Sequence, residues 1–138
     1  MTTTTPAPTV ERINPTSWSE AFGFDQAQAR PAPSRLLTLS GQGPVDETGA
    51  LLHEGDPAAQ VALAMTNVET VLAAGGMTFA DVLRMTVYAV DVDAVLASYG
   101  VIGERLGRAG ATPPMTLLGV ARLAIPGMLI EIEVTAGR

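Results

Sequence analysis

Two amphipathic helices are the clearest elements that the pattern of apolar and polar positions predicts. In the first, apolar residues recur at spacings of four, three and four, which places them on one helical face: Val61, Met65, Val68 and Leu72. Asp56 can cap the amino end, and Pro57 suits the first helical position. Gly75-Gly76 then ends the helix with residues that accept a left-handed conformation.

The second helix is expected to begin after Asp91 or Asp93. Its apolar stripe has the same spacing as that of the first helix: Val95, Tyr99, Ile102 and Leu106. Glu104 and Arg108 stand one turn apart and form an i,i+4 pair on the outer side. The pattern therefore predicts one helix in this region.

Apolar runs and alternation predict strands over residues 35–40, 82–90, 115–123 and 128–136, with a further short strand around residues 22–28. Within residues 82–90, one face is expected to carry the apolar side chains Leu83, Met85, Val87 and Ala89. The other face is expected to carry Arg84, Thr86 and Tyr88. Residues 115–123 are apolar throughout, which is typical of burial on both faces.

Two helices on one face of a mostly antiparallel or mixed sheet make an α+β architecture of two layers. The opposite sheet face is expected to be apolar, and a lone domain would leave it in water, so we expect an oligomer to bury it. Residues 1–10 are mostly threonine and proline, which predicts a disordered tail. The remaining residues, 11–138, are expected to form a single domain.

The composition excludes several classes of chemistry. The 138-residue chain has no cysteine, no lysine and one histidine, which excludes thiolate nucleophiles, lysine Schiff bases and metal sites rich in cysteine or histidine. A net charge of −6 argues against a phosphate-binding surface, so we expect no nucleic-acid partner. Because no apolar run reaches membrane-spanning length and no signal peptide is recognisable, we expect no membrane partner and a cytoplasmic location.

The composition leaves carboxylates, arginine, tyrosine, hydroxyls, backbone amides and water as candidate chemical groups. Glu131 and Glu133 share a strand face, where a carboxylate beside an apolar pocket can act as general acid or base; a solvent-facing strand edge is the alternative. The turn Ser40-Gly41-Gln42-Gly43-Pro44 offers amides to an anion, or is only a tight turn. Tyr88 can donate a hydrogen bond inside a binding pocket, or is a core residue with its hydroxyl at the sheet edge.

Two arginines and the single histidine are further candidates. Arg84 and Arg122 can each bind a carboxylate in bidentate fashion, with a surface or interface ion pair as the alternative. His53 falls in a predicted loop and is expected to be exposed. No motif pairs this histidine with a serine nucleophile.

Several short motifs, taken in order, resemble the Rid family, also called the YjgF family. They include Ser40-Gly41-Gln42-Gly43-Pro44, Gly55-Asp56, Asn67, Val87-Tyr88 with Asp91, Val120-Ala121-Arg122-Leu123 and Ile130-Glu131-Ile132-Glu133. Matching stretches run from about residue 12 to residue 136. Each motif is common by itself, but their order and spacing together are specific.

The resemblance implies a chorismate-mutase-like α+β fold and a homotrimer whose sheets form a central barrel, with clefts between the subunits. It implies hydrolysis of imine and enamine intermediates, such as 2-aminoacrylate, to ketoacids and ammonia without a cofactor or metal. In the family an arginine holds the substrate carboxylate, a glutamate of the last strand handles water, and the glycine turn lines the cleft.

This chain matches the family site only in part. Glu131 stands at the position of the water-handling glutamate, and Gly41 and Gln42 stand at the turn. Met115 occupies the arginine position, and Phe24 occupies the position of an N-terminal tyrosine. Loss of a buried partner of a charge costs about 2–5 kcal/mol. The resemblance therefore implies reduced or altered activity toward small iminoacids, in a cleft that Met115 and Phe24 make apolar.

Two functions of different classes follow from these residues. The first is an enzyme that hydrolyses or tautomerises an imine, an enamine or a related carbonyl metabolite, with Glu131 as the acid/base group. The alternative is a trimer that binds a small molecule in an apolar cleft between subunits without catalysis. A ribonuclease or translation-inhibitor role is disfavoured by the acidic charge, the absence of lysine and the lack of a histidine pair.

Overall fold

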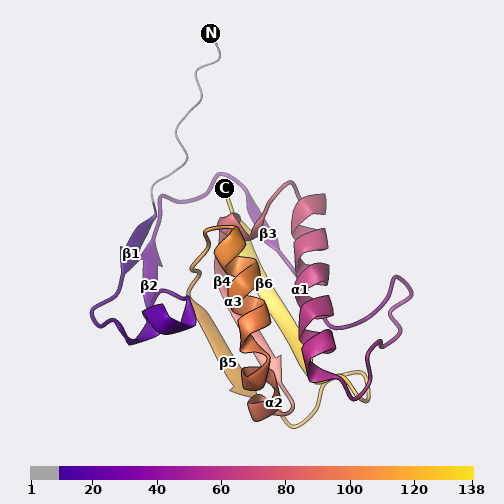
Figure 1. The fold of residues 1–138 in the computed structure, drawn as a ribbon. Helices are drawn as coiled ribbons and strands as arrows, with labels where there is room; N and C mark the ends of the chain where they lie inside the picture. Colours follow the sequence, from indigo (N-terminus) through magenta and orange to yellow (C-terminus); the bar gives the residue numbers. More distant parts are fainter. Residues whose placement is uncertain (1–9) are drawn as a thin grey trace.

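A mixed sheet of four strands, covered by helices on one face, forms the body of the protein (Figure 1). The computed structural model describes residues 10–138, so the tail predicted over residues 1–10 lies outside the described residues except for Val10. The strands follow the order β3-β6-β4-β5 and span Leu36–Thr38 (β3), Val82–Ala89 (β4), Met115–Gly119 (β5) and Ile130–Gly137 (β6). The helices span Pro57–Ala74 (α1), Val92–Ala97 (α2) and Tyr99–Arg108 (α3). The predicted α+β architecture of two layers is confirmed.

The sheet combines one parallel and two antiparallel strand pairs. β6 pairs antiparallel with both β3 and β4, whereas β5 runs parallel to β4. A parallel pair needs a crossover connection, and α2 and α3 supply it between β4 and β5. In Figure 1, α1 and α3 lie side by side across the sheet, and buried apolar side chains of both helices share one core with its inner face.

α1 forms as the sequence predicts because each local signal agrees with its packing. The Asp56 carboxylate accepts a hydrogen bond from the Ala59 amide at 3.1 Å, and Pro57 is the first helical residue. The predicted stripe is fully buried: Val61, Met65, Val68 and Leu72. Gly76 follows the helix with a φ of +75°, a conformation that favours glycine.

The second predicted helix is instead two helices, with a break at Ser98. The side chain of Asp91 caps α2 by accepting from the Ala94 amide at 3.1 Å. At the break, the Ser98 amide donates to the Val95 carbonyl and the Val101 amide donates to Ser98, which are three-residue bonds that tighten the chain. The stripe continues through the break, so periodicity alone gave no sign of it.

The predicted position of Leu83 on the same face as Met85 and Val87 is wrong, because β4 contains a bulge at this residue. A register shift between Val82 and Arg84 inserts an extra residue into the strand, and Val82 is buried on the helical side. Leu83 is only half-buried. Beyond the bulge the alternation is as predicted, with Met85 and Val87 buried against the helices.

β5 and the uncovered sheet face are more polar and more exposed than expected. β5 ends at Gly119 and lies at the sheet edge, with Thr116 and Leu118 exposed, so the prediction of a strand over 115–123 buried on both faces is wrong for this chain. By strand alternation the uncovered face carries mainly polar side chains, among them Arg84, Thr86, Tyr88, Thr116, Glu131, Glu133 and Thr135. The expectation of an apolar second face is therefore wrong, and a trimeric barrel stays a prediction.

An N-terminal hairpin stands beside this sheet. β1 (Glu11–Ile13) pairs antiparallel with β2 (Ala27–Ala29), and a 3-10 helix over Trp18–Phe22 connects them. The predicted strand around residues 22–28 therefore begins later, at Ala27, and its partner β1 was not predicted. Both strands have three residues, too few for a clear alternation.

Candidate functional site

Glu131 lies against the glycine turn, next to which the family resemblance places it. It stands on β6, on the uncovered face, and is half-buried. A Cβ placed on Gly41 would lie 2.0 Å from Glu131 Oε1, so only glycine leaves room for this carboxylate. Within residues 10–138 the carboxylate of Glu131 makes no hydrogen bond or ion pair, so its lone pairs are available to water or a ligand.

The turn itself is fixed to β6 and to α1. Gln42 and Ile132 exchange two backbone hydrogen bonds, of 2.8 and 2.9 Å. From α1, the Asn67 amide group donates to the carbonyls of Gly43 and Val45 at 2.8 and 3.0 Å. The turn is thus held on both sides, and Gly41 cannot move away from Glu131 without breaking these bonds.

Tyr88 joins Glu131 and Glu133 on the same face. Its backbone pairs with Glu131 across the sheet, while its hydroxyl donates to Glu133 Oε1 at 2.8 Å. This hydrogen bond stabilises the protonated phenol and raises the pKa of Tyr88. We call this group the carboxylate site; it consists of Gly41, Gln42, Tyr88, Glu131 and Glu133.

Met115 and Phe24 meet in a second place, a cavity of about 220 Å³ at the edge of β5. We call it the apolar pocket; its lining comprises Trp18, Phe22, Phe24, Leu96, Tyr99, Met115 and Leu117. Met115 pairs with Met85, whose side chain is buried under the helices, so Met115 lies on the helical side of the sheet. Glu131 lies on the opposite side. Within one chain the structure therefore does not bring Met115 and Phe24 to Glu131.

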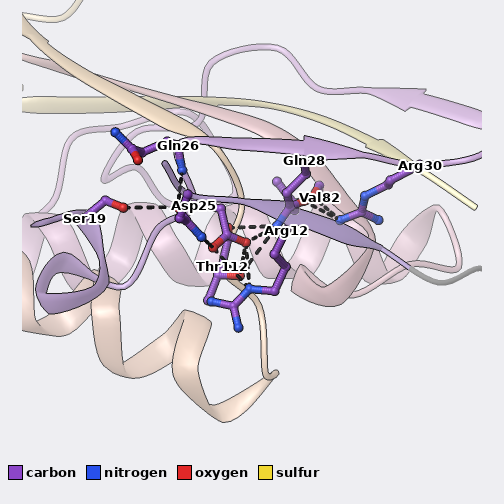
Figure 2. A network of polar contacts seen from close by, with 9 residues as sticks. Arg12, Ser19, Asp25, Gln26, Gln28, Arg30, Val82 and Thr112 are labelled. Atoms are coloured by element: carbon purple, nitrogen blue, oxygen red, sulfur yellow. Dashed lines mark hydrogen bonds and ion pairs between the residues drawn. The ribbon is translucent and has the colours of Figure 1, made fainter. Parts of the chain in front are cut away.

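A buried carboxylate, Asp25, stands at the centre of a network of polar contacts (Figure 2). Asp25, which is 1% exposed, accepts hydrogen bonds from Arg12, Asn14, Gln28 and Thr112 at 2.7–2.9 Å. Burial by itself raises the pKa of Asp25, but these hydrogen bonds together hold it well below its usual range. Because Phe24 precedes Asp25 and Thr112 leads into β5, the network fixes one pocket wall relative to the other.

The other charged candidates do not join either site. Arg84 donates to the Thr116 hydroxyl at 2.9 Å on the uncovered face, and exposed Arg122 donates to the Leu123 carbonyl at 3.4 Å. Exposed His53 has a φ of +59° in the loop before α1. No group of three or more His, Cys, Asp or Glu side chains within residues 10–138 is arranged to hold a metal ion.

Sequence reasoning missed most of the apolar pocket and the Asp25 network. Trp18, Phe22 and Phe24 stand within seven residues, and their rings contact one another at centroid distances of 5.5–6.5 Å. Three of the six aromatic residues in so short a segment were a usable signal. Asp25 carried no such signal, because Thr112 is 87 residues away in the sequence.

Comparisons with known proteins identify the family of the chain. The family model described as Endoribonuclease L-PSP matches residues 23–137. Protein DfrA of Myxococcus xanthus is 34% identical over 105 residues, which cover 74% of this chain and 76% of DfrA. A solved structure of the Rid family protein YyfB from Yersinia pestis, described as of unknown function, has a TM-score of 0.82 at 34% identity and covers 94% of this chain and 98% of YyfB.

A second solved structure, E. coli TdcF with bound serine, has a TM-score of 0.68 at 28% identity and covers 83% of this chain and 87% of TdcF. The family model matches most of the chain, and these three relatives are similar to it over most of their length. The chain belongs to the Endoribonuclease L-PSP family, the Rid or YjgF family. No helix within residues 10–138 has the length and apolar character to cross a membrane.

Proposed function

We propose that this protein is a cytoplasmic homotrimer that hydrolyses an imine, an enamine or a related carbonyl metabolite in clefts between its subunits. The chemistry needs no cofactor, and Glu131 is its acid/base group. The observation that carries the proposal is the fit of the Glu131 carboxylate against Gly41, where any larger residue would collide with it. A carboxylate that lies against a glycine turn and has free lone pairs is suited to orient water.

The proposed reaction balances with water as the only co-reactant. Glu131 accepts a proton from water while the water oxygen bonds to the imine carbon, and it passes this proton to the nitrogen, which gives a neutral carbinolamine. Glu131 then accepts the proton of the new hydroxyl as the carbonyl forms and the C–N bond breaks, and it passes this proton to the leaving nitrogen, which departs as ammonia. The products are a carbonyl compound and ammonia, and Glu131 ends in its initial state. An enamine enters this sequence after a proton shifts to its carbon.

The division of the candidate residues between two sheet faces supports a cleft built from two subunits. Glu131 and Gly41 are on the uncovered face, whereas Met115 and Phe24 are on the helical side. In a trimer, the carboxylate site of one subunit can face the apolar pocket of the next. The resemblance to the Rid family implies such clefts between subunits.

The substrate of this cleft differs from a small iminoacid. Within residues 10–138 no arginine lines the apolar pocket, the chain has no lysine, and Met115 stands where the family resemblance places an arginine. A carboxylate entering this pocket would lose its hydration and gain no charged partner there. An arginine contributed by a neighbouring subunit, such as Arg84 of the uncovered face, would reverse this expectation.

A second candidate function is binding without catalysis, and the apolar pocket favours it. A pocket of about 220 Å³ with an apolar lining can bind a small molecule with no contribution from Glu131. In that case ligand binding depends on Met115 and Phe24 and persists in Glu131→Gln.

An assay of ammonia release tests the enzymatic proposal. Wild type, Met115→Arg and Glu131→Gln are compared on 2-aminoacrylate and related iminoacids, with the uncatalysed rate subtracted. We expect low activity in wild type and higher activity in Met115→Arg. A double variant that combines Met115→Arg with Glu131→Gln is expected to show no activity above background. No catalysis of any imine by wild type or Met115→Arg would contradict the proposal and favour the binding function.

A further inference from the structure

The apolar pocket combines exposed aromatic side chains with a neutral lining. Trp18 is 57% exposed, Phe22 51% and Leu96 49%, and all three stand at this pocket. Large apolar surfaces that face water in one place mark binding sites. Within the described part of the chain, the residues that line the pocket carry no charge, so an occupant forms no ion pair with them.

The Tyr99 hydroxyl is a polar group at the pocket that a ligand can contact. It donates to the Phe22 carbonyl at 2.8 Å and lies 3.3 Å from Met115 Sδ. Burial raises the pKa of Tyr99, so the phenol is neutral at physiological pH. Its single proton is engaged in these contacts, whereas its oxygen lone pairs can accept a hydrogen bond. A ligand group that donates, such as a hydroxyl or an N–H, matches this oxygen.

The size and geometry of the pocket favour a ring. An apolar cavity of about 150 Å³ holds benzene, so about 220 Å³ accommodates one ring with a short substituent. The Trp18 ring already contacts Phe22 and Phe24 edge-on, at interplanar angles of 66° and 77°. Aromatic rings prefer such edge-to-face neighbours, so a further ring finds suitable partners here.

From these observations we propose that the apolar pocket binds a neutral molecule with one aromatic ring and a short substituent that donates a hydrogen bond. If this ligand is also the substrate, which rests on the proposed function, the substrate is an imine or carbonyl compound with an aromatic ring and no carboxylate. Binding at the pocket itself does not depend on catalysis. The Asp25 network (Figure 2) joins the segment that carries Phe24 to the segment that enters β5, so two walls of the pocket are tied together before binding.

Trp18 is the single tryptophan of the chain, and it lines the pocket, so its fluorescence reports occupancy directly. Benzyl alcohol and benzoate form a matched pair of probes, with the same ring and a neutral or anionic substituent. We expect benzyl alcohol to change the Trp18 emission saturably, and benzoate to bind at least about tenfold more weakly, which corresponds to about 1.4 kcal/mol. Calorimetry provides an independent measure of the same affinities.

Two charge variants and one control sharpen the test. Met115→Arg is expected to reverse the preference of wild type, so that benzoate binds more tightly than benzyl alcohol. Because Met115 packs against the core, Leu96→Arg on the exposed rim provides the same charge with less risk to folding. Leu52→Ala, an exposed apolar residue outside this pocket, is expected to change neither affinity.

Several results would overturn the assignment. They are equal or tighter binding of benzoate by wild type, the absence of saturable binding of benzyl alcohol, and an unchanged preference in both arginine variants. Trp18 emission that responds to protein dilution but not to benzyl alcohol would show that a second copy of the chain covers the pocket, and would also overturn it.

A turnover measurement separates this inference from the proposed function. The imine of phenylacetaldehyde and the imine of phenylpyruvate, each generated in place by an oxidase, differ only in the carboxylate. We expect faster enzymatic ammonia release from the first. Binding of benzyl alcohol without any turnover would contradict the proposed function and leave the pocket assignment intact, whereas turnover of carboxylated imines without binding of benzyl alcohol would contradict the pocket assignment alone.

Discussion

The hydroxyl of Thr112 donates to the buried carboxylate of Asp25 at 2.7 Å and so joins the N-terminal hairpin to the segment that enters β5. Arg12, Asn14 and Gln28 direct further N–H donors at the same carboxylate. Because Phe24 precedes Asp25 and Thr112 lies just before Met115, the network sets the position of Phe24 relative to Met115. The shape of the apolar pocket therefore depends on a group that does not line it.

Asp25→Asn is expected to destabilise the fold by about 1–3 kcal/mol, because the new amide group would face N–H donors in a site that excludes water. Urea unfolding measures this loss. Asp46→Asn is the matched control: Asp46 also accepts several hydrogen bonds, from Thr48 and Ala50, but in an exposed loop. Equal losses in the two variants would contradict the structural role of Asp25.

The same carboxylate predicts a dependence of stability on pH. The pKa of Asp25 is lower in the folded protein than in the unfolded chain, where it is about 3.9. Its contribution is therefore complete above the unfolded value and is lost as the pH falls below about 4 toward the folded pKa. The difference in unfolding free energy between wild type and Asp25→Asn is expected to shrink between pH 5 and pH 3. A constant difference over this range would contradict the expectation.

Gly41→Ala is expected to displace the Glu131 side chain, because the added Cβ would lie 2.0 Å from Oε1. Activity is expected to fall at least about tenfold, since misplacing a catalytic group by about 1 Å costs as much or more. Gly100→Ala in α3 is the control, because within residues 10–138 no atom outside its chain neighbours and the nearby helix backbone would lie within 4 Å of the added Cβ; it should raise stability by up to about 1 kcal/mol and leave activity unchanged. Similar rates for Gly41→Ala and wild type would contradict this account of the carboxylate site.

Removal of the Glu133 charge is expected to lower the pKa of Tyr88. In the folded protein Glu133 raises this pKa above 10.0, because ionisation would break their hydrogen bond and place two negative charges together. Glu133→Gln keeps an acceptor oxygen but removes the charge, so ultraviolet titration should show one phenol that ionises at lower pH. The second tyrosine, Tyr99, is assigned with Tyr99→Phe and should be unaffected. No change in either phenol would contradict the observed contact.

The fold was predictable where several local signals coincide. In α1 the cap at Asp56, the proline at residue 57 and the stripe from Val61 to Leu72 all indicate the same helix. The break at Ser98 and the bulge beside Leu83 were not predictable in this way, because neither interrupts the apolar repeat that periodicity detects.

The candidate site was predictable only in its local parts. The approach of Glu131 to Gly41 agrees with the family resemblance, and Met115 and Phe24 do line one pocket. Their separation from Glu131 follows from the register of β5 and β6 on β4, which no short motif reports. The Asp25 network depends on a contact across 87 residues, and sequence patterns describe only near neighbours.

The central claim is that Glu131 carries the acid/base chemistry, and the comparison of Glu131→Gln with Glu133→Gln tests it most directly. The two glutamates share one strand face, but Glu131 lies against Gly41 and Glu133 is engaged by Tyr88. With the best imine substrate of wild type, Glu131→Gln is expected to lower kcat at least about 100-fold and Glu133→Gln much less. Equal losses in the two variants, or full activity in Glu131→Gln, would contradict the claim.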